Sequence, residues 1–280
     1  MRQPSSRAPG RALVLGVLAC AVGACHRGHG SSSQGPAATT LEVDFALRTD
    51  LVLGSAYLGD VAHGDLDGDG VTDLVEANFG TRFVTIAFGL ANGRFATFHE
   101  LPTLGHAFQL ALDDLDGDGL LDIAVSEGEW LDGAPQAVQV FLQGPLPREF
   151  GPALDFPLDG SPKGLVSMPA DGRVGGAPGE LYVALRDAQR IQRLIVAGGV
   201  LQANGALDSA PVGLGSPYSL AALDLGGDGF VDLVVGEDNP GSDRLLELRR
   251  DAGGFLAARV LLDGLAQPIV DATGDMDSNG

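Results

Sequence analysis

The chain has 280 residues, with 37 acidic and 17 basic side chains and a formal net charge of −20 at pH 7. This balance excludes a nucleic-acid-binding protein with a basic face and favours cations as partners. Hydrophobic residues make up 45% of the chain, which excludes a disordered protein, and its 42 glycines and 16 prolines favour short strands joined by tight turns.

Residues 1–25 have the pattern of an export signal. Three arginines precede an apolar run from Ala12 to Ala24, which is too short to cross a bilayer because a span takes about 20 apolar residues. The run ends in Val-Gly-Ala-Cys, which resembles a lipoprotein cleavage site. We therefore expect lipidation of Cys25 and anchorage to the outer membrane or surface of a bacterial cell. Cys20 is a second candidate, and an ordinary signal peptide is the alternative.

Residues 26–40 are rich in glycine and serine and predict a flexible tether before a domain at residues 41–280. Both cysteines of the chain lie before the tether. The domain can therefore form no internal disulfide, although export normally permits one. Some other interaction must hold its loops.

An acidic motif recurs along the domain. The segment Asp65–Asp73 reads Asp-Leu-Asp-Gly-Asp-Gly-Val-Thr-Asp, Asp114–Asp122 repeats it closely, and Asp224–Asp232 is a third copy. Each copy is followed by an apolar, strand-like run, and a fourth copy begins at Asp275. Recurrence of one motif at a fixed spacing is the sequence signature of a repeat architecture.

The spacing divides the domain into units. The last aspartates of the first two copies are 49 residues apart, and 110 residues separate Asp122 from Asp232. The larger interval predicts a degenerate unit between them, marked by Asp171-Gly172 and by the run that starts at Glu180. The predicted units lie near residues 48–98, 99–158, 159–212 and 213–262, with a partial unit at 263–280.

Each unit is consistent with four strands and no helix. In the second unit we expect strands at residues 108–112, 122–126, 137–142 and 153–158. A four-stranded unit of about 50 residues predicts an all-β fold, a β-propeller with calcium-binding loops. We expect four to five blades of a longer ring, for example a seven-bladed one. Residues 41–47 would be an outer strand that completes the last blade.

The acidic loops predict calcium sites. Unit charges about 4 Å apart repel by about 1 kcal/mol in water and about 4 kcal/mol at an effective dielectric constant near 20, so a divalent cation should bind. Ca²⁺ accepts six to eight oxygen ligands in flexible geometry, whereas Mg²⁺ needs a stricter octahedron. The predicted ligands are Asp65, Asp67, Asp69, Val71 (main-chain oxygen) and Asp73; Asp114, Asp116, Asp118, Leu120 (main-chain oxygen) and Asp122; Asp224, Asp228, Phe230 (main-chain oxygen) and Asp232; and Asp275, Asp277 and Asn279.

The third copy has Gly226 at its second acidic position, so we expect weaker binding there and none in the degenerate unit. Over residues 41–280 the motifs resemble the FG-GAP or VCBS repeats of integrin α-subunit propellers and of exported bacterial proteins. That resemblance implies calcium loops between the first two strands of each blade. The lost acids and the small number of units depart from the integrin pattern.

Three other interpretations of the acidic motif remain. An EF-hand would explain Glu76 at the twelfth loop position, but Val125 and Val235 replace it in the other copies. A nonapeptide β-roll would require a tandem array around Gly226, which is absent. The acids could also be solvated turn residues without a metal.

The loops at the opposite end of each blade carry aromatic and polar residues that could bind a protein or glycan. These residues could instead fill gaps between blades. We predict a binding or adhesion module rather than an enzyme, because no nucleophile and base have a recognisable spacing. The alternatives are a polysaccharide hydrolase or lyase and the scaffold part of a longer surface protein. The residues concerned are Tyr57, His106, Phe108, Trp130 and Tyr218, with Asn78, Glu127, Glu129, Glu237 and Asp238.

Overall fold

The computed structural model describes residues 57–96, 99–128, 133–176, 178–208, 214–239 and 243–265. Over these ranges we find no helix long and apolar enough to cross a membrane. Several predictions concern other parts of the chain and lie outside the described residues: the signal and Cys25, the tether, the strand at 41–47, and the fourth acidic motif.

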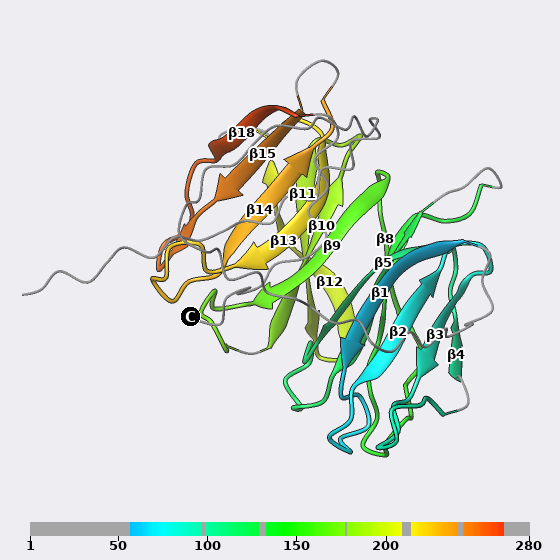
Figure 1. Ribbon diagram of the computed structural model, residues 1–280. Helices are drawn as coiled ribbons and strands as arrows, with labels where there is room; N and C mark the ends of the chain where they lie inside the picture. The colour runs from blue at the N-terminus through cyan, green and yellow to red at the C-terminus, as the bar shows by residue number, and fades with distance from the viewer. Residues whose placement is uncertain are drawn as a thin grey trace, which may run out of the picture.

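The described chain forms four antiparallel sheets of four strands each, together with one short hairpin (Figure 1). The first sheet contains β1 (Leu58–Gly64), β2 (Asp73–Asn78), β3 (Phe83–Ala87) and β4 (His99–Pro102). The second contains β5 (His106–Asp113), β6 (Asp122–Gly128), β7 (Ala137–Phe141) and β8 (Leu154–Pro157). The third contains β9 (Pro162–Pro169), β10 (Gly179–Leu185), β11 (Arg190–Ala197) and β12 (Val200–Asp208). The fourth contains β13 (Pro217–Leu223), β14 (Asp232–Glu237), β15 (Asp243–Leu248) and β18 (Arg259–Leu265), and the hairpin pairs β16 (Arg250–Asp251) with β17 (Gly254–Phe255).

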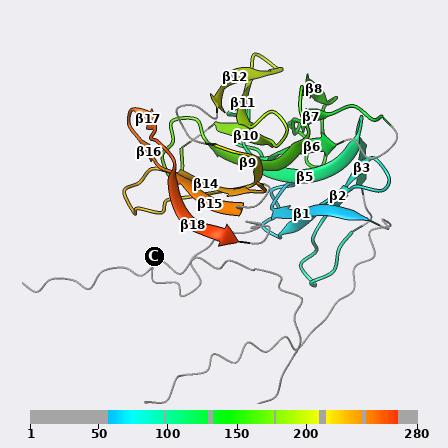
Figure 2. The same ribbon diagram turned by 90° about the horizontal axis from the view of Figure 1, so that it is seen from above.

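The sheets are arranged as the blades of a propeller. Within each sheet the strands follow in chain order, and the first strand of each blade lies beside that of the next: β1 contacts β5, β5 contacts β9, and β9 contacts β13. Seen from above, the blades fan outwards from these inner strands (Figure 2). The predicted all-β propeller of four-stranded blades is confirmed, and the degenerate third unit forms a blade as complete in strands as the others.

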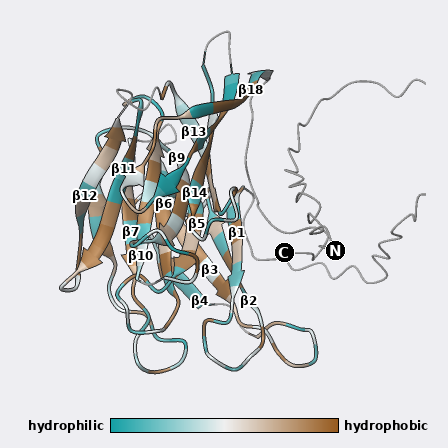
Figure 3. Cartoon of the chain, turned by 90° about the vertical axis from the view of Figure 1, so that its left-hand side faces the viewer, coloured by the Kyte–Doolittle hydropathy of each residue, from teal (hydrophilic) through white to brown (hydrophobic). Residues whose placement is uncertain are grey.

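Hydrophobic side chains fill the spaces between neighbouring blades. One core lies between blades 1 and 2, a second between blades 2 and 3, and a third between blades 3 and 4. In β6, Ile123 and Val125 pack toward blade 1 while Ala124 packs toward blade 3. The second strand of a blade is thus buried on both faces, which explains apolar runs such as Ile123–Val125 and the brown segments of the strands in Figure 3.

Glycine lets the inner strands approach one another closely. A Cβ atom at Gly59 would lie 2.5 Å from the carbonyl oxygen of Phe108, and one at Gly164 would lie 2.9 Å from Cγ of Leu220. Both contacts join first strands of adjacent blades. A side chain at either position would therefore push two blades apart.

The strands of the second blade lie close to the ranges that the sequence predicts. Differences occur at the unit edges: β4 completes the first blade at residues 99–102, after the predicted limit of 98, and β18 runs to residue 265, past 262. The predicted limits followed the spacing of the acidic motif. The outer strands carry no such motif, so their ends were not marked.

Candidate metal centres

The three acidic loops join the first and second strands of blades 1, 2 and 4. Two glycines in each of the first two loops have positive φ angles, 74° and 82° at Gly68 and Gly70 and 86° and 88° at Gly117 and Gly119. Other residues rarely adopt this conformation, so the glycines fix the bend of the loop. Strands on both sides rule out the EF-hand, whose loop is flanked by helices.

The first aspartate of each loop is bound by the main chain of the same loop. Oδ1 of Asp65 accepts hydrogen bonds from the amides of Gly68 and Asp69, and Oδ2 accepts one at 2.9 Å from Gly70. Asp114 accepts the corresponding bonds at 2.7 and 3.0 Å from Gly117 and Gly119. These bonds wrap the loop around the first carboxylate and turn the following acids toward it.

Two groups of acids come together as metal ligands would. Carboxylate oxygens of Asp65, Asp67 and Asp73 lie within 4.8 Å of one another, and so do those of a second group formed by Asp114, Asp116 and Asp118. Oδ1 of Asp116 and Oδ1 of Asp118 accept loop amides, while in the described structure their Oδ2 atoms have no protein partner. Hard oxygen donors in a glycine-bent loop fit Ca²⁺.

The other predicted ligands lie outside these groups. Asp69 lies between Asp67 and Asp73 in the first loop but is not part of that group, and Asp122 is buried and is not part of the second. Among the described residues, Asp224, Asp228 and Asp232 form no group of this kind. The amides of Val71, Leu120 and Phe230 donate to Asp69, Asp118 and Asp228, respectively.

The last aspartate of each loop is a buried brace. Asp122 accepts hydrogen bonds from the amides of Leu115 at 2.9 Å and Gln143 at 2.8 Å. It thereby joins the start of its loop to the chain that follows the third strand. Desolvation raises its pKa from 3.8 to about 6. Asp73 and Asp232 make the equivalent pairs of bonds, and burial likewise raises the pKa of each.

The donors to these braces are main-chain amides, which the sequence did not reveal. Gly89, Gln143 and Arg250 each follow a third strand and donate to the last aspartate of their own blade. Each also pairs with a phenylalanine, at positions 95, 150 and 255. Phe95 and Phe255 lie 19 and 20 residues before the next acidic motifs, at Asp114 and Asp275, and this spacing is the one available signal in the sequence; Phe150 does not share it.

Arginines from one blade enter the loop of the preceding blade. Nε of Arg148, in blade 2, donates to Oδ2 of Asp67 in blade 1 at 2.7 Å, and its guanidinium lies 4.5 Å from the ring centre of Phe88. Arg250, in blade 4, donates to the carbonyl oxygens of Ala170 at 2.7 Å and Pro169 at 3.3 Å in blade 3. Within the described residues the third blade lacks an acidic cluster, and the guanidinium of Arg250 binds the turn between β9 and β10 instead.

At the opposite end, the polar residues expected on the surface are mostly buried. Asn78, Glu127 and Glu237 are at most 2% exposed, so the expectation that they line a binding face is wrong. Oε2 of Glu127 accepts the amide of Gly105 at 2.6 Å, and Glu237 accepts that of Gly215. They hold the segments that lead into the first strands of blades 2 and 4. Trp130 and Glu129 lie outside the described residues.

Glu127→Gln is expected to remove a pH-dependent loss of stability. Burial raises the pKa of Glu127 from 4.5 to about 7, so over this interval the unfolded chain loses a proton that the folded chain retains. The free energy of unfolding of the parent should therefore fall as the pH rises through the interval, by about 3 kcal/mol, and level off above it. Urea denaturation across this range measures the slope. Glu100→Gln, at an exposed position, is the control, and equal slopes for parent and Glu127→Gln would contradict the prediction.

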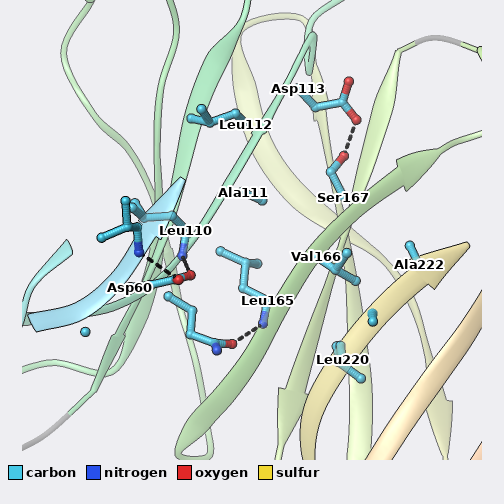
Figure 4. Close-up of a pocket in the computed structure, with 14 residues that line it drawn as sticks. Asp60, Leu110, Ala111, Leu112, Asp113, Leu165, Val166, Ser167, Leu220 and Ala222 are labelled. Atoms are coloured by element: carbon cyan, nitrogen blue, oxygen red, sulfur yellow. Dashed lines mark hydrogen bonds between the residues drawn. The ribbon is translucent and has the colours of Figure 1, made fainter. Parts of the chain in front are cut away.

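A cavity of about 680 Å³ lies among the inner strands (Figure 4). Its polar groups connect adjacent blades: Oδ2 of Asp60 accepts the amide of Leu110 at 3.0 Å, and the Ser167 hydroxyl donates to Oδ2 of Asp113 at 2.5 Å. Gln109 accepts the amide of Leu165 at 2.9 Å. These side chains fasten the inner strands to one another.

Residues 65–125 match the family model described as the FG-GAP-like repeat. This segment is an FG-GAP-like repeat. It begins at the first acidic loop and extends through the second loop into β6. The FG-GAP-like repeat therefore covers both groups of clustered acids. No curated protein matches the chain.

Similar solved structures include a complex of BBS1N with ARL6DN soaked with lead, with 19% identity and a TM-score of 0.47 over 72% of this chain and 57% of that one. The exotype rhamnogalacturonan lyase YesX has 16% identity and a TM-score of 0.44 over 72% and 47%. A Bacillus licheniformis rhamnogalacturonan lyase, PL11, has 15% identity and a TM-score of 0.42 over 76% and 51%. The FG-GAP-containing chain thus covers about half the length of each.

Proposed function

We propose that the chain is a calcium-stabilised β-propeller that binds a protein or a glycan at the cell envelope. The observation that carries the proposal is the convergence of three carboxylates within 4.8 Å in each of two FG-GAP-type loops. Bound calcium would neutralise the repulsion among these acids. The chain itself supplies the glycine bends and the main-chain hydrogen bonds that hold the first carboxylate in place.

The export pattern at residues 1–25 supports an extracellular role for the metal. Calcium sites of extracellular modules have dissociation constants of about 10⁻⁴ to 10⁻³ M. Such sites are filled in calcium-rich surroundings and do not report changes in concentration. Calcium would therefore take the place of disulfides, which the domain cannot form because both cysteines precede it.

The end of the blades opposite the acidic loops is the better surface for a partner. Tyr57, Leu58 and Leu104 are 58%, 63% and 43% exposed there, in the segments that lead into or begin the first strands of two adjacent blades. Large exposed hydrophobic side chains that lie on neighbouring blades favour an interaction surface. The buried acids beneath them hold the backbone in place.

Retention on arrays of glycans and peptides tests the proposal. We expect calcium-loaded protein to bind a ligand without turnover, and Leu104→Glu to weaken binding at least tenfold because a charge enters the contact surface. Val174→Glu is the matched control, because Val174 is exposed in the turn at the other end of the third blade. Equal loss with both variants, or binding that survives Leu104→Glu, would contradict this surface.

The alternative is a polysaccharide lyase or hydrolase. It is favoured by Glu127, a carboxyl group with a pKa of about 7, which suits a general acid or base. Its burial and its hydrogen bond to Gly105 favour a structural role instead. Glycan cleavage by the parent that is abolished in Glu127→Gln would establish the enzyme.

A further inference from the structure

We propose that the guanidinium of Arg249 replaces the metal ion in the third acidic loop, which spans Asp224–Asp232 in blade 4. This loop would then close without a divalent cation. The inference rests on the proposed function, in which the first two loops hold calcium. The third loop does not fit calcium as the others do, because in the described structure its three aspartates do not converge.

Arg249 occupies the place of a missing ligand. Gly226 stands two residues after the first aspartate, where the other loops have Asp67 and Asp116. A Cβ atom built at Gly226 would collide with Nη2 of Arg249. The same Nη2 lies 2.9 Å from Oδ2 of Asp228. The guanidinium therefore fills the position of the second carboxylate and neutralises the third.

Among the equivalent positions in blades 1, 2 and 4, this arginine occurs in blade 4 alone. The residue before each main-chain donor to the brace is Phe88 in blade 1, Leu142 in blade 2 and Arg249 in blade 4. An apolar residue at this position accompanies an acid at the second loop position. Arginine accompanies glycine. The second loop position and the position before the donor thus vary together. A loop has either an acid at the first of these positions and binds a metal, or an arginine at the second and needs none.

Arg148 and Arg249 act differently. Arg148 reaches Asp67 from the neighbouring blade, and Asp67 still converges with Asp65 and Asp73. Arg249 belongs to the blade whose loop it enters, and that loop has one acid fewer. An arginine remains charged at every physiological pH. Asp228, one of the three acids of the third loop, is therefore paired with a permanent positive charge, whereas the first loop keeps a convergent set of oxygens.

The ion pair of Arg249 with Asp228 is partly exposed, with 45% and 41% of the side chains accessible. Exposed pairs contribute little to stability, so metal uptake and local protection are better measurements than the melting temperature. Calorimetric titration with CaCl₂ of the full chain should show one more bound ion in Gly226→Asp/Arg249→Leu than in the parent. Gly226→Asp alone should gain none, because the new acid pairs with Arg249. A folded double variant with no additional ion would overturn the inference.

Hydrogen exchange separates this inference from the proposed function. In the parent protein with chelator, the amides of Asp228 and Gly229 should already be protected from exchange, since they donate to Asp224. Arg249→Leu should raise their exchange rates at least tenfold. Added calcium should slow exchange at Gly117 and Gly119 and leave Asp228 and Gly229 unchanged. Slowing at Asp228 and Gly229 in the parent would overturn the replacement by Arg249. No slowing at Gly117 and Gly119 would instead overturn the proposed calcium loops.

Discussion

Asp122→Ala is expected to lower the free energy of unfolding by about 3 kcal/mol, equally with calcium and with chelator. The carboxylate is fully buried and accepts the amides of Leu115 and Gln143. Alanine leaves both donors buried without an acceptor, and each loss costs about 1–3 kcal/mol. Urea denaturation followed by circular dichroism measures the change.

Asp122→Asn is the matched control for this brace. Its single carbonyl oxygen can accept one of the two amides, so we expect about half the loss. Because Asp122 stands outside the converging group of Asp114, Asp116 and Asp118, the stabilisation gained from calcium should persist in both variants. A variant that is as stable as the parent in chelator but no longer responds to calcium would make Asp122 a ligand, as its motif position predicts.

Asp116→Ala is expected to have the opposite profile, with a loss in calcium and almost none in chelator. Asp116 is exposed and its Oδ1 accepts one amide of its own loop. An ion present at 100 times its dissociation constant stabilises the folded state by about 2.7 kcal/mol, and most of this should disappear. For a domain of this size, that corresponds to a fall of several degrees in the melting temperature.

Melting curves in calcium at about 100 times its dissociation constant, which is about 10 mM for a site of 10⁻⁴ M, in magnesium and in chelator test this prediction. Glu100→Ala removes an exposed acid from β4 and controls for the change in net charge. Asp67→Ala is a less direct test because Asp67 also binds Arg148 across the blade boundary. Identical calcium responses of Asp116→Ala and the parent would exclude Asp116 from the site.

The fold could be predicted because the positions that define its repeat accept only a few residue types. Gly68 and Gly70 require positive φ angles, the acids require counter-charges, and the double burial of Ile123 to Val125 requires an unbroken apolar run. The degenerate unit was located from the spacing, together with Asp171-Gly172 and the run that starts at Glu180. It still forms a blade because its strands, such as β10, retain the buried residues on both faces.

The division of labour within the loops could not be predicted from the sequence. Asp116 and Asp122 are the same residue in the same motif, yet one is exposed and the other is a buried brace. The difference arises from amides supplied by the chain after the third strand, such as that of Gln143. Arg249 lies 23 residues from Gly226, and no local pattern links them. The prediction of exposed acids at the other end was wrong because Glu127 and Glu237 are buried and accept main-chain amides.

The guanidinium of Arg250 in the turn of the third blade has a consequence for biogenesis. Its bond to the Ala170 carbonyl joins residues 80 positions apart. A chain that emerges from its amino end must leave this turn incomplete until the following blade has appeared. Maturation of the third blade is therefore delayed by one whole module. A chain halted at residue 212 would leave that half-formed turn open to proteases.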